Sequence, residues 1–157
     1  MMLGSAKKTR SKGFTLVEIM ISLAILGILA AISIPNFRMY KDRAECVSMM
    51  TTLKYLMDGE DFHFLENGSF HPQSGTLNIP RETAVKIPEL AYNFSEGNKN
   101  RYRIRASSNR WRDYYQITVF CDFDSNGNGK KDRFKATTDI RKRTGVVKKN
   151  REIVQLR

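Results

Sequence analysis

The sequence predicts an α+β fold in which a long N-terminal helix packs on a small antiparallel β-sheet. Three observations support it: a continuous apolar run, a helical stripe of apolar residues after it, and short segments that alternate apolar and polar residues. A chain of 157 residues, 41% of them hydrophobic, accommodates one ordinary domain and an appendage. We expect a basic leader at 1–13, a transmembrane helix at 14–34, its amphipathic continuation at 35–64 and a globular β domain at 65–157.

The apolar run over residues 14–34 is long enough to cross a membrane as a helix. A hydrocarbon core of about 30 Å requires about 20 helical residues, and Glu18 is the only charged residue in the run. Four basic residues and no acidic residue lie within 1–12, so the positive-inside tendency places the N-terminus in the cytoplasm. The remainder of the chain is then expected outside the inner membrane.

The predicted helix continues as an amphipathic segment. Apolar residues recur every three or four positions, at Ala44, Val47, Met50, Leu53 and Leu56. Pro35 lies between the two halves and removes one backbone donor, so we expect a kink or local melting there. Beyond Phe64, a stretch rich in Gly, Pro, Ser and Asn, which ends at Pro80, is predicted to be a loop.

Period-two alternation predicts three strands after this loop. The residues expected to face the core are Tyr102, Ile104 and Ala106, then Tyr115, Ile117, Val119 and Cys121, and finally Phe134 and Ala136. The segments 146–147 and 153–156 are expected to add an edge strand.

The residues KGFTLVE at 12–18, with an apolar run that ends in Ile34–Pro35, resemble the N-terminus of type IV pilins and of the related pseudopilins of type II secretion. The resemblance is close over about the first 40 residues and agrees only in outline afterwards. It implies that a prepilin peptidase removes the leader after Gly13 and that the new terminal residue, Phe14, is N-methylated. It also implies that Glu18 faces the amine of a neighbouring subunit in an assembled fibre.

Chemistry supports a paired role for Glu18 independently. A carboxylate in an apolar medium costs several kcal/mol unless a cation lies beside it. The nearest cation in the processed chain is the α-amine of Phe14, either its own or a neighbour's. The alternative is an interfacial carboxylate that favours the N-terminal end of the helix dipole.

The resemblance implies a structural subunit of a type IV pilus, inserted in the inner membrane and polymerised through its N-terminal helix into a surface fibre. The alternatives are a pseudopilin of a type II secretion system, in a periplasmic fibre, and a minor pilin that binds DNA or anionic surfaces. The implied partners are copies of itself or other pilins, the prepilin peptidase and the assembly machinery. Catalysis is not predicted, because His63 and His71 lack metal-ligand spacing and no nucleophile motif is present.

The chain is strongly basic, which favours polyanions and acidic surfaces. Its net charge of +11 falls to +7 without the leader, which carries four basic residues and no acidic one. Candidate contacts for a polyanion are Arg101, Arg103, Arg105, Arg110 and Arg112, together with the tail at Arg141–Arg143. Trp111 and Tyr114 lie beside them and could stack on bases. The alternative is a solvated face whose charge only keeps the domain soluble.

A loop after the second predicted strand carries oxygen ligands in a calcium-like pattern. Its candidate ligands are Asp122, Asp124, Asn126, Asn128 and Asp132. The first part matches the core of an EF-hand loop, but Arg133 stands where the bidentate acid normally lies. The alternative is a metal-free hairpin, because both Asn-Gly pairs form tight turns readily. We therefore expect Ca²⁺ as the one candidate cofactor.

The two cysteines, Cys46 and Cys121, are both expected on the extracytoplasmic side. A disulfide between them is plausible in that oxidising compartment. The alternative is two small buried thiols, since free cysteine packs well in a core.

Overall fold

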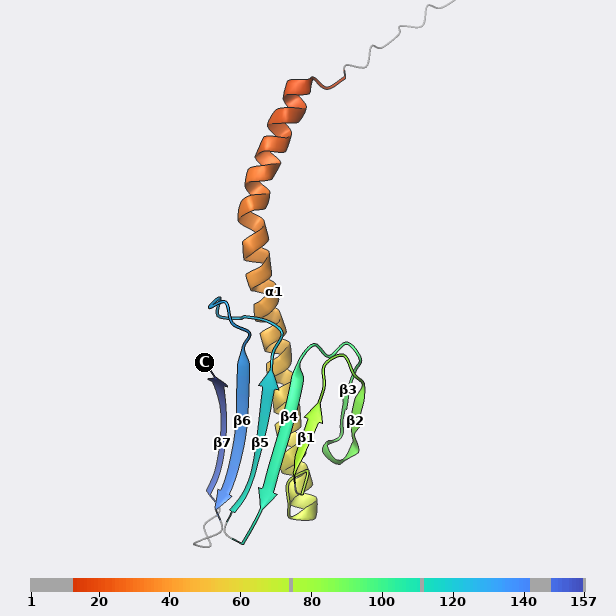
Figure 1. The fold of residues 1–157 in the computed structure, drawn as a ribbon, viewed down its shortest axis with the longest axis vertical. Helices are drawn as coiled ribbons and strands as arrows, with labels where there is room; N and C mark the ends of the chain where they lie inside the picture. Colours follow the sequence, from red (N-terminus) through yellow and green to blue (C-terminus); the bar gives the residue numbers. More distant parts are fainter. Residues whose placement is uncertain (1–12, 74, 111, 142–147, 157) are drawn as a thin grey trace, which may run out of the picture. The chain divides into compact units, whose positions relative to one another are not determined.

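We describe a computed structural model of the chain, which defines residues 13–73, 75–110, 112–141 and 148–156 (Figure 1). The chain divides into two compact units, Met1–Arg38 and Met39–Arg157, which are described separately below. The α+β fold class is confirmed: one long N-terminal helix and an antiparallel sheet of several strands make up the described chain.

Helix α1 comprises Leu16–Asn67. It continues without interruption through Pro35, so the predicted local melting does not occur in this structure. A proline removes a single donor, and the flanking turns keep their own hydrogen bonds. The helix ends beyond the predicted 35–64 segment, where Gly68 adopts a left-handed φ of 68° and donates its N–H to the Phe64 carbonyl at 2.8 Å.

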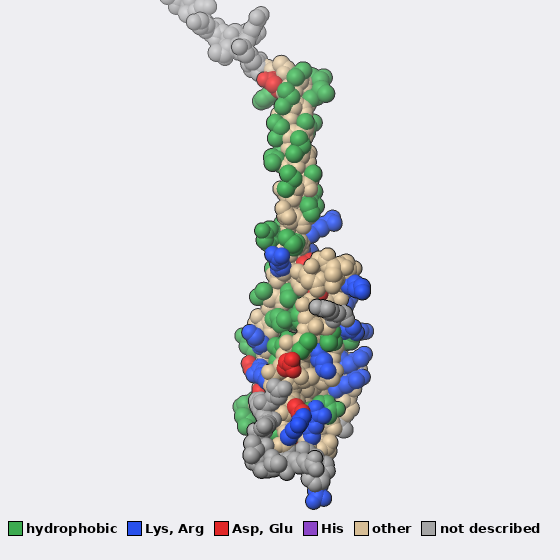
Figure 2. Space-filling model, turned by 90° about the vertical axis from the view of Figure 1, so that its left-hand side faces the viewer, with side chains coloured by type: hydrophobic (Ala, Val, Ile, Leu, Met, Phe, Trp, Pro, Cys, Tyr) green, Lys and Arg blue, Asp and Glu red, His purple; other side chains and the backbone are tan. Residues whose placement is uncertain are grey.

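In the first unit, no other described segment covers the apolar helix. Every residue from Gly13 to Arg38 is exposed, and bulky side chains such as Leu16 and Ile28 expose 75% and 64% of their surface. Figure 2 shows these apolar side chains along the helix of this unit. The segment is long and apolar enough to cross a membrane. Because so much apolar surface is costly in water, the segment requires lipid or other helices around it.

The second unit contains a five-stranded antiparallel sheet with strand order β1-β4-β5-β6-β7 and a separate two-stranded sheet (Figure 1). The five strands are β1 (Thr76–Ile79), β4 (Arg101–Ser108), β5 (Arg112–Phe120), β6 (Arg133–Arg141) and β7 (Lys148–Leu156). The small sheet pairs β2 (Val85–Ile87) with β3 (Tyr92–Phe94), joined through the 3₁₀ turn η1 (Pro88–Leu90).

The central strands agree with the alternation in the sequence. All residues predicted to face the core are buried: Tyr102, Ile104, Ala106, Tyr115, Ile117, Val119, Cys121, Phe134 and Ala136. Segment 153–156 belongs to edge strand β7, whereas 146–147 lies outside the described residues. The prediction that residues up to Pro80 form only a loop is wrong, because β1 pairs with β4 and buries Ile79 completely.

The core lies between the second half of α1 and the inner face of the sheet. The helix contributes Met49, Leu53, Leu56 and Met57, and these pack with the buried strand residues. The predicted stripe is shifted at its start, since Ala44 and Val47 are exposed and Met49 is buried. Among the described residues, every buried one lies in this unit, so residues 39–157 hold a complete core.

Gly59 of α1 lies directly against the backbone of the turn η1. A Cβ built at this position would lie 2.5 Å from the carbonyl oxygen of Leu90, which is backbone and cannot rotate away. We expect Gly59→Ala to destabilise residues 39–157 by about 1–3 kcal/mol, as overpacking does elsewhere, although alanine favours helix. Urea unfolding measures the loss, with the exposed helical change Ser48→Ala as the control. An unchanged midpoint for Gly59→Ala would contradict the close contact.

Candidate functional site

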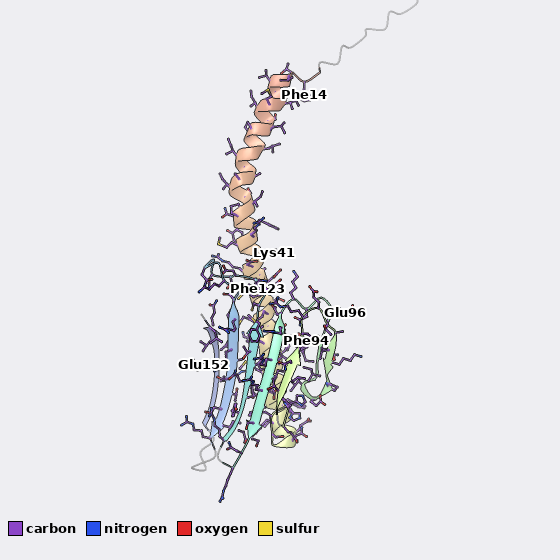
Figure 3. All side chains as sticks on the ribbon, in the orientation of Figure 1. Phe14, Lys41, Phe94, Glu96, Phe123 and Glu152 are labelled. Carbon is purple, nitrogen blue, oxygen red and sulfur yellow. The ribbon has the colours of Figure 1, made fainter. Side chains whose placement is uncertain are left out.

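The proposed cleavage site lies in an extended, uncovered segment before α1. Gly13 and Phe14 are not helical, and the Phe14 side chain exposes 85% of its surface at the helix end (Figure 3). A Cβ built on Gly13 would meet no atom within 4 Å. The peptide bond between these residues is therefore sterically open among the described residues.

Thr15 and Glu18 form a capping box at the start of α1. The Thr15 N–H and hydroxyl donate to Glu18 Oε2 at 2.8 and 2.9 Å, and the Glu18 N–H donates to Thr15 Oγ1 at 3.2 Å. This reciprocal arrangement satisfies backbone donors that a helix start leaves open. The Thr-x-x-Glu spacing that signals it is present in the sequence, and our sequence reasoning missed it.

The capping box occupies only one of the two carboxylate oxygens of Glu18. Both Thr15 donors reach Oε2, and no described residue donates to Oε1. The carboxylate can therefore keep its helix cap and still accept a further donor. The two roles considered for Glu18, capping of its own helix and pairing with a cation, are compatible in this geometry.

In the candidate calcium loop, residues 121–132, the carboxylate of Asp124 bonds to the backbone of the loop itself. Asp124 accepts the N–H groups of Gly127, Asn128 and Gly129 at 2.9, 3.2 and 2.6 Å. Both glycines have the positive φ that a tight wrap needs, at 73° and 80°. The loop joins β5 to β6 as a hairpin connection, and Phe123 anchors it to the core (Figure 3).

The other candidate ligands in the loop have different partners. Asp122 pairs with Arg81 at 3.1 Å and with Lys131. Asp132 is buried and accepts from the Ser125 N–H at 2.7 Å and from Gln155 Nε2 at 2.8 Å. Within the described part of the chain, no three His, Cys, Asp or Glu side chains gather as a metal site. Calcium binding therefore stays a prediction.

Calcium would have to replace these internal bonds, and its binding is measurable as added stability. If the loop binds the ion, residues 39–157 melt at a higher temperature in Ca²⁺ than in chelator, and Asp124→Asn removes the difference. An ion that binds only the folded state raises the free energy of unfolding by about 2.7 kcal/mol at an ion concentration of 100 times Kd. The control Glu89→Gln, an exposed acid outside the loop, keeps the shift. Equal melting temperatures of the parent fragment in both buffers would refute the prediction.

The two cysteines are free thiols in this structure. Cys121 is buried, and burial with the nearby Asp132 carboxylate raises its pKa to about 12. Cys46 is half-buried and packs against the same core. The predicted alternative of buried thiols fits Cys121, while Cys46 keeps some exposure. A disulfide between them stays a prediction, which an intact mass of the protein tests.

The arginines predicted to contact a polyanion separate into two groups. Arg101, Arg103 and Arg105 project from β4, on the sheet face opposite the core. Arg112 pairs with Asp139 at 2.7 Å and lies 4.9 Å above the ring of Tyr114, so that ring is already occupied. Arg110 is exposed beyond β4 and makes a contact of its own, while Trp111, Lys142 and Arg143 lie outside the described residues.

A cluster of Glu60, His63 and His71 lies at the end of α1. Sequence reasoning missed the burial of Glu60 and assigned no function to the two histidines. Glu60 is fully buried on α1, and its Oε2 accepts the His71 N–H at 2.9 Å. His63 lies near the helix end, as expected, with Nδ1 2.7 Å from the Ser69 carbonyl. No sequence pattern signals this cluster, because Glu60 reads as one more polar residue of an amphipathic helix.

An exposed apolar N-terminal helix, opened by a motif around Gly13 and joined to an antiparallel sheet, is the layout of pilin-like proteins. The model of the prokaryotic N-terminal methylation motif matches residues 8–34. The type IV major pilin protein PilA of Myxococcus xanthus is 33% identical over 99 residues, which are 63% of this chain and 39% of that pilin.

Relatives from secretion systems align over more of their own length. Type II secretion system core protein G of Klebsiella pneumoniae is 31% identical over 69% of this chain and 74% of its own. Core protein G of Escherichia coli K12 is 29% identical over 69% and 72% of the two chains. No solved structure gives a significant match. The chain belongs to the family of type IV pilins and type II secretion pseudopilins.

Proposed function

We propose that this protein is a structural subunit of a type IV pilus, cleaved after Gly13, N-methylated on Phe14 and polymerised through α1. The observation that carries the proposal is the uncovered apolar helix of residues 14–34, which opens with the capped carboxylate of Glu18. Before assembly, lipid of the inner membrane surrounds this helix. In the fibre, neighbouring helices of the same kind take the place of the lipid.

A pseudopilin is the second candidate, and the relatives give a specific reason for it. This chain covers 74% of the Klebsiella core protein G but only 39% of the Myxococcus pilin. The similarity therefore includes a larger part of core protein G than of the pilin. Both candidates share the processing steps and the helix packing. They differ in where the fibre ends, at the cell surface or in the periplasm.

One strain experiment separates the two candidates. The pilus role requires surface fibres that an antibody to residues 39–157 labels, and their loss on deletion of the gene. Unlabelled surfaces combined with loss of protein secretion on deletion would instead establish the pseudopilin. An intact mass of the membrane-extracted protein tests the maturation steps, since it must show loss of residues 1–13 and addition of one methyl group.

A further inference from the structure

A cationic surface lies on the outer face of the five-stranded sheet, the face that does not pack on α1. Strand alternation places Arg101, Arg103 and Arg105 there from β4, and Arg133 and Lys135 from β6. We call these five residues the cationic face. Figure 2 shows basic side chains projecting in a column from the side of the globular unit.

The sheet register sets the spacing of the cationic face. Arg101 and Arg133 both lie opposite Phe120, and Arg103 and Lys135 both lie opposite Thr118. Two strand spacings separate the members of each pair, about 9.6 Å, and successive arginines on β4 are about 6.8 Å apart. Two rows of positive charge therefore border a neutral strip, which β5 supplies.

Two acids share the outer face with these five cations, and neither forms an ion pair with them among the described residues. Asp139 lies farther along β6 and pairs there with Arg112 and Arg141, at 2.7 and 3.7 Å. Glu152 of β7 lies opposite Thr137, the next outward residue after Lys135 on β6. Among the described residues, none forms an ion pair with Arg105, Arg133 or Lys135. The face thus presents cations that remain available to an external anion.

The remaining two arginines are held in place by neutral contacts. Arg101 and Arg103 lie over the Phe120 ring, 4.2 and 5.4 Å from its centre, and Arg103 Nε donates to Asn78 Oδ1 at 3.1 Å. Such contacts fix a guanidinium without neutralising it. They also occupy part of the Phe120 ring, which is half-buried.

We propose that the cationic face binds duplex DNA through its phosphates, without reading the base sequence. Guanidinium groups bind phosphate oxygens in a bidentate manner, which suits the arginine-rich rows. The β4 row spans about 14 Å, a length over which a duplex carries about eight phosphates. Alginate, an acidic polysaccharide with one carboxylate per sugar, offers fewer charges over the same length. The net positive charge of the chain also disfavours a second copy as the occupant.

Fluorescence anisotropy with a labelled 30-base-pair duplex tests the proposal, using the full-length protein in non-ionic detergent. Binding is expected at 100 mM salt, with log K falling against log salt at a slope of about −4 to −5 for five phosphates neutralised. Replacing Arg105, Arg133 and Lys135 by Gln should weaken binding at least about tenfold and reduce the slope by nearly 3, because about 0.9 is lost per contact.

A matched control removes the same charge elsewhere. Lys41, Lys54 and Lys86 are exposed and lie on α1 and β2, away from the outer face, and their replacement by Gln should leave affinity within about threefold. An equal loss in both triple variants, or no binding by the parent protein, would overturn the proposal. So would alginate that displaces the protein better than DNA at equal charge. Because the protein is unassembled in this assay, the result is independent of fibre formation.

Discussion

Glu18→Gln is expected to insert into the membrane like the parent protein but to yield about tenfold less assembled fibre, or none. Glutamine still accepts the Thr15 N–H, so the capping box of α1 survives the change. The negative charge is lost, and in the proposed fibre this would leave the amine of a neighbouring Phe14 in apolar surroundings without a counter-ion. Leaving one buried charge unpaired costs about 3–5 kcal/mol, which is enough to prevent addition of a subunit.

Two companion variants separate charge from capping. Thr15→Val keeps the shape of the side chain but removes the hydroxyl that bonds Glu18 Oε2 and accepts the Glu18 N–H. It should cost about 1 kcal/mol of helix stability and leave assembly largely intact. Glu18→Ala should fail as Glu18→Gln does. Membrane extraction, intact mass and quantification of sheared fibre measure insertion, processing and assembly in turn.

The pattern among the three variants identifies the role of Glu18. If Glu18→Gln assembles normally while Glu18→Ala and Thr15→Val both fail, the residue acts through the helix cap alone. If Glu18→Gln fails and Thr15→Val assembles, the charge is what assembly requires. Normal fibre, or normal secretion in a strain that makes a pseudopilus, from all three variants would remove Glu18 from the assembly site altogether.

The helix and the central strands were predictable because each repeats a strong period. The alternation in β4 and β5 buries every second residue, from Tyr102 to Ala106 and from Tyr115 to Val119, and Cys121 directly after β5 continues it. Such segments have only one register that puts their apolar side chains in the core. The prepilin-like motif is equally local, so the candidate site at Gly13, Phe14 and Glu18 could be found without a structure.

The short strands and the buried polar cluster were not predictable because they depend on tertiary contacts. Strand β1 has four residues, and its pairing with β4, which ends at Ile79 opposite Tyr102, holds it in the sheet. The sequence assigned no partner to Arg151, which the register of β7 places beside α1. There its guanidinium lies 2.7 Å from Asp58 and 3.6 Å from Asp61. Local secondary-structure propensity gives no information about these partners, because they are distant in the sequence.

Glu60 shows how a buried acid makes the stability of the globular unit depend on pH. Its side chain is fully buried, its Oε1 has no hydrogen-bond partner among the described residues, and its Oε2 accepts only the His71 N–H. The titratable groups facing it are Asp61 on α1, His71 in the following loop and Tyr115 on β5. Burial raises the pKa of Glu60 to about 8, and the bond from His71 only partly offsets that rise.

The sign of the effect follows from this raised pKa. Below the ordinary carboxyl value of 4.5 both the folded and unfolded chains hold the proton, and Glu60 costs nothing. As the pH rises towards about 8, the unfolded chain loses the proton while the folded chain retains it. The free energy of unfolding therefore falls by about 1.4 kcal/mol per pH unit from this group alone.

Glu60→Gln removes this titration, because glutamine stays neutral and can still accept the His71 N–H. Relative to the parent fragment 39–157, the variant should gain several kcal/mol in unfolding free energy between pH 5 and pH 8, as measured by urea unfolding at each pH. Burial also lowers the pKa of His71, but that contribution is common to both proteins and largely cancels in the difference. The exposed helix acid Glu66, changed to Gln, should leave the pH dependence of the parent unaltered. A constant difference between the Glu60→Gln and parent fragments across this range would mean that the carboxyl titrates normally in the fold.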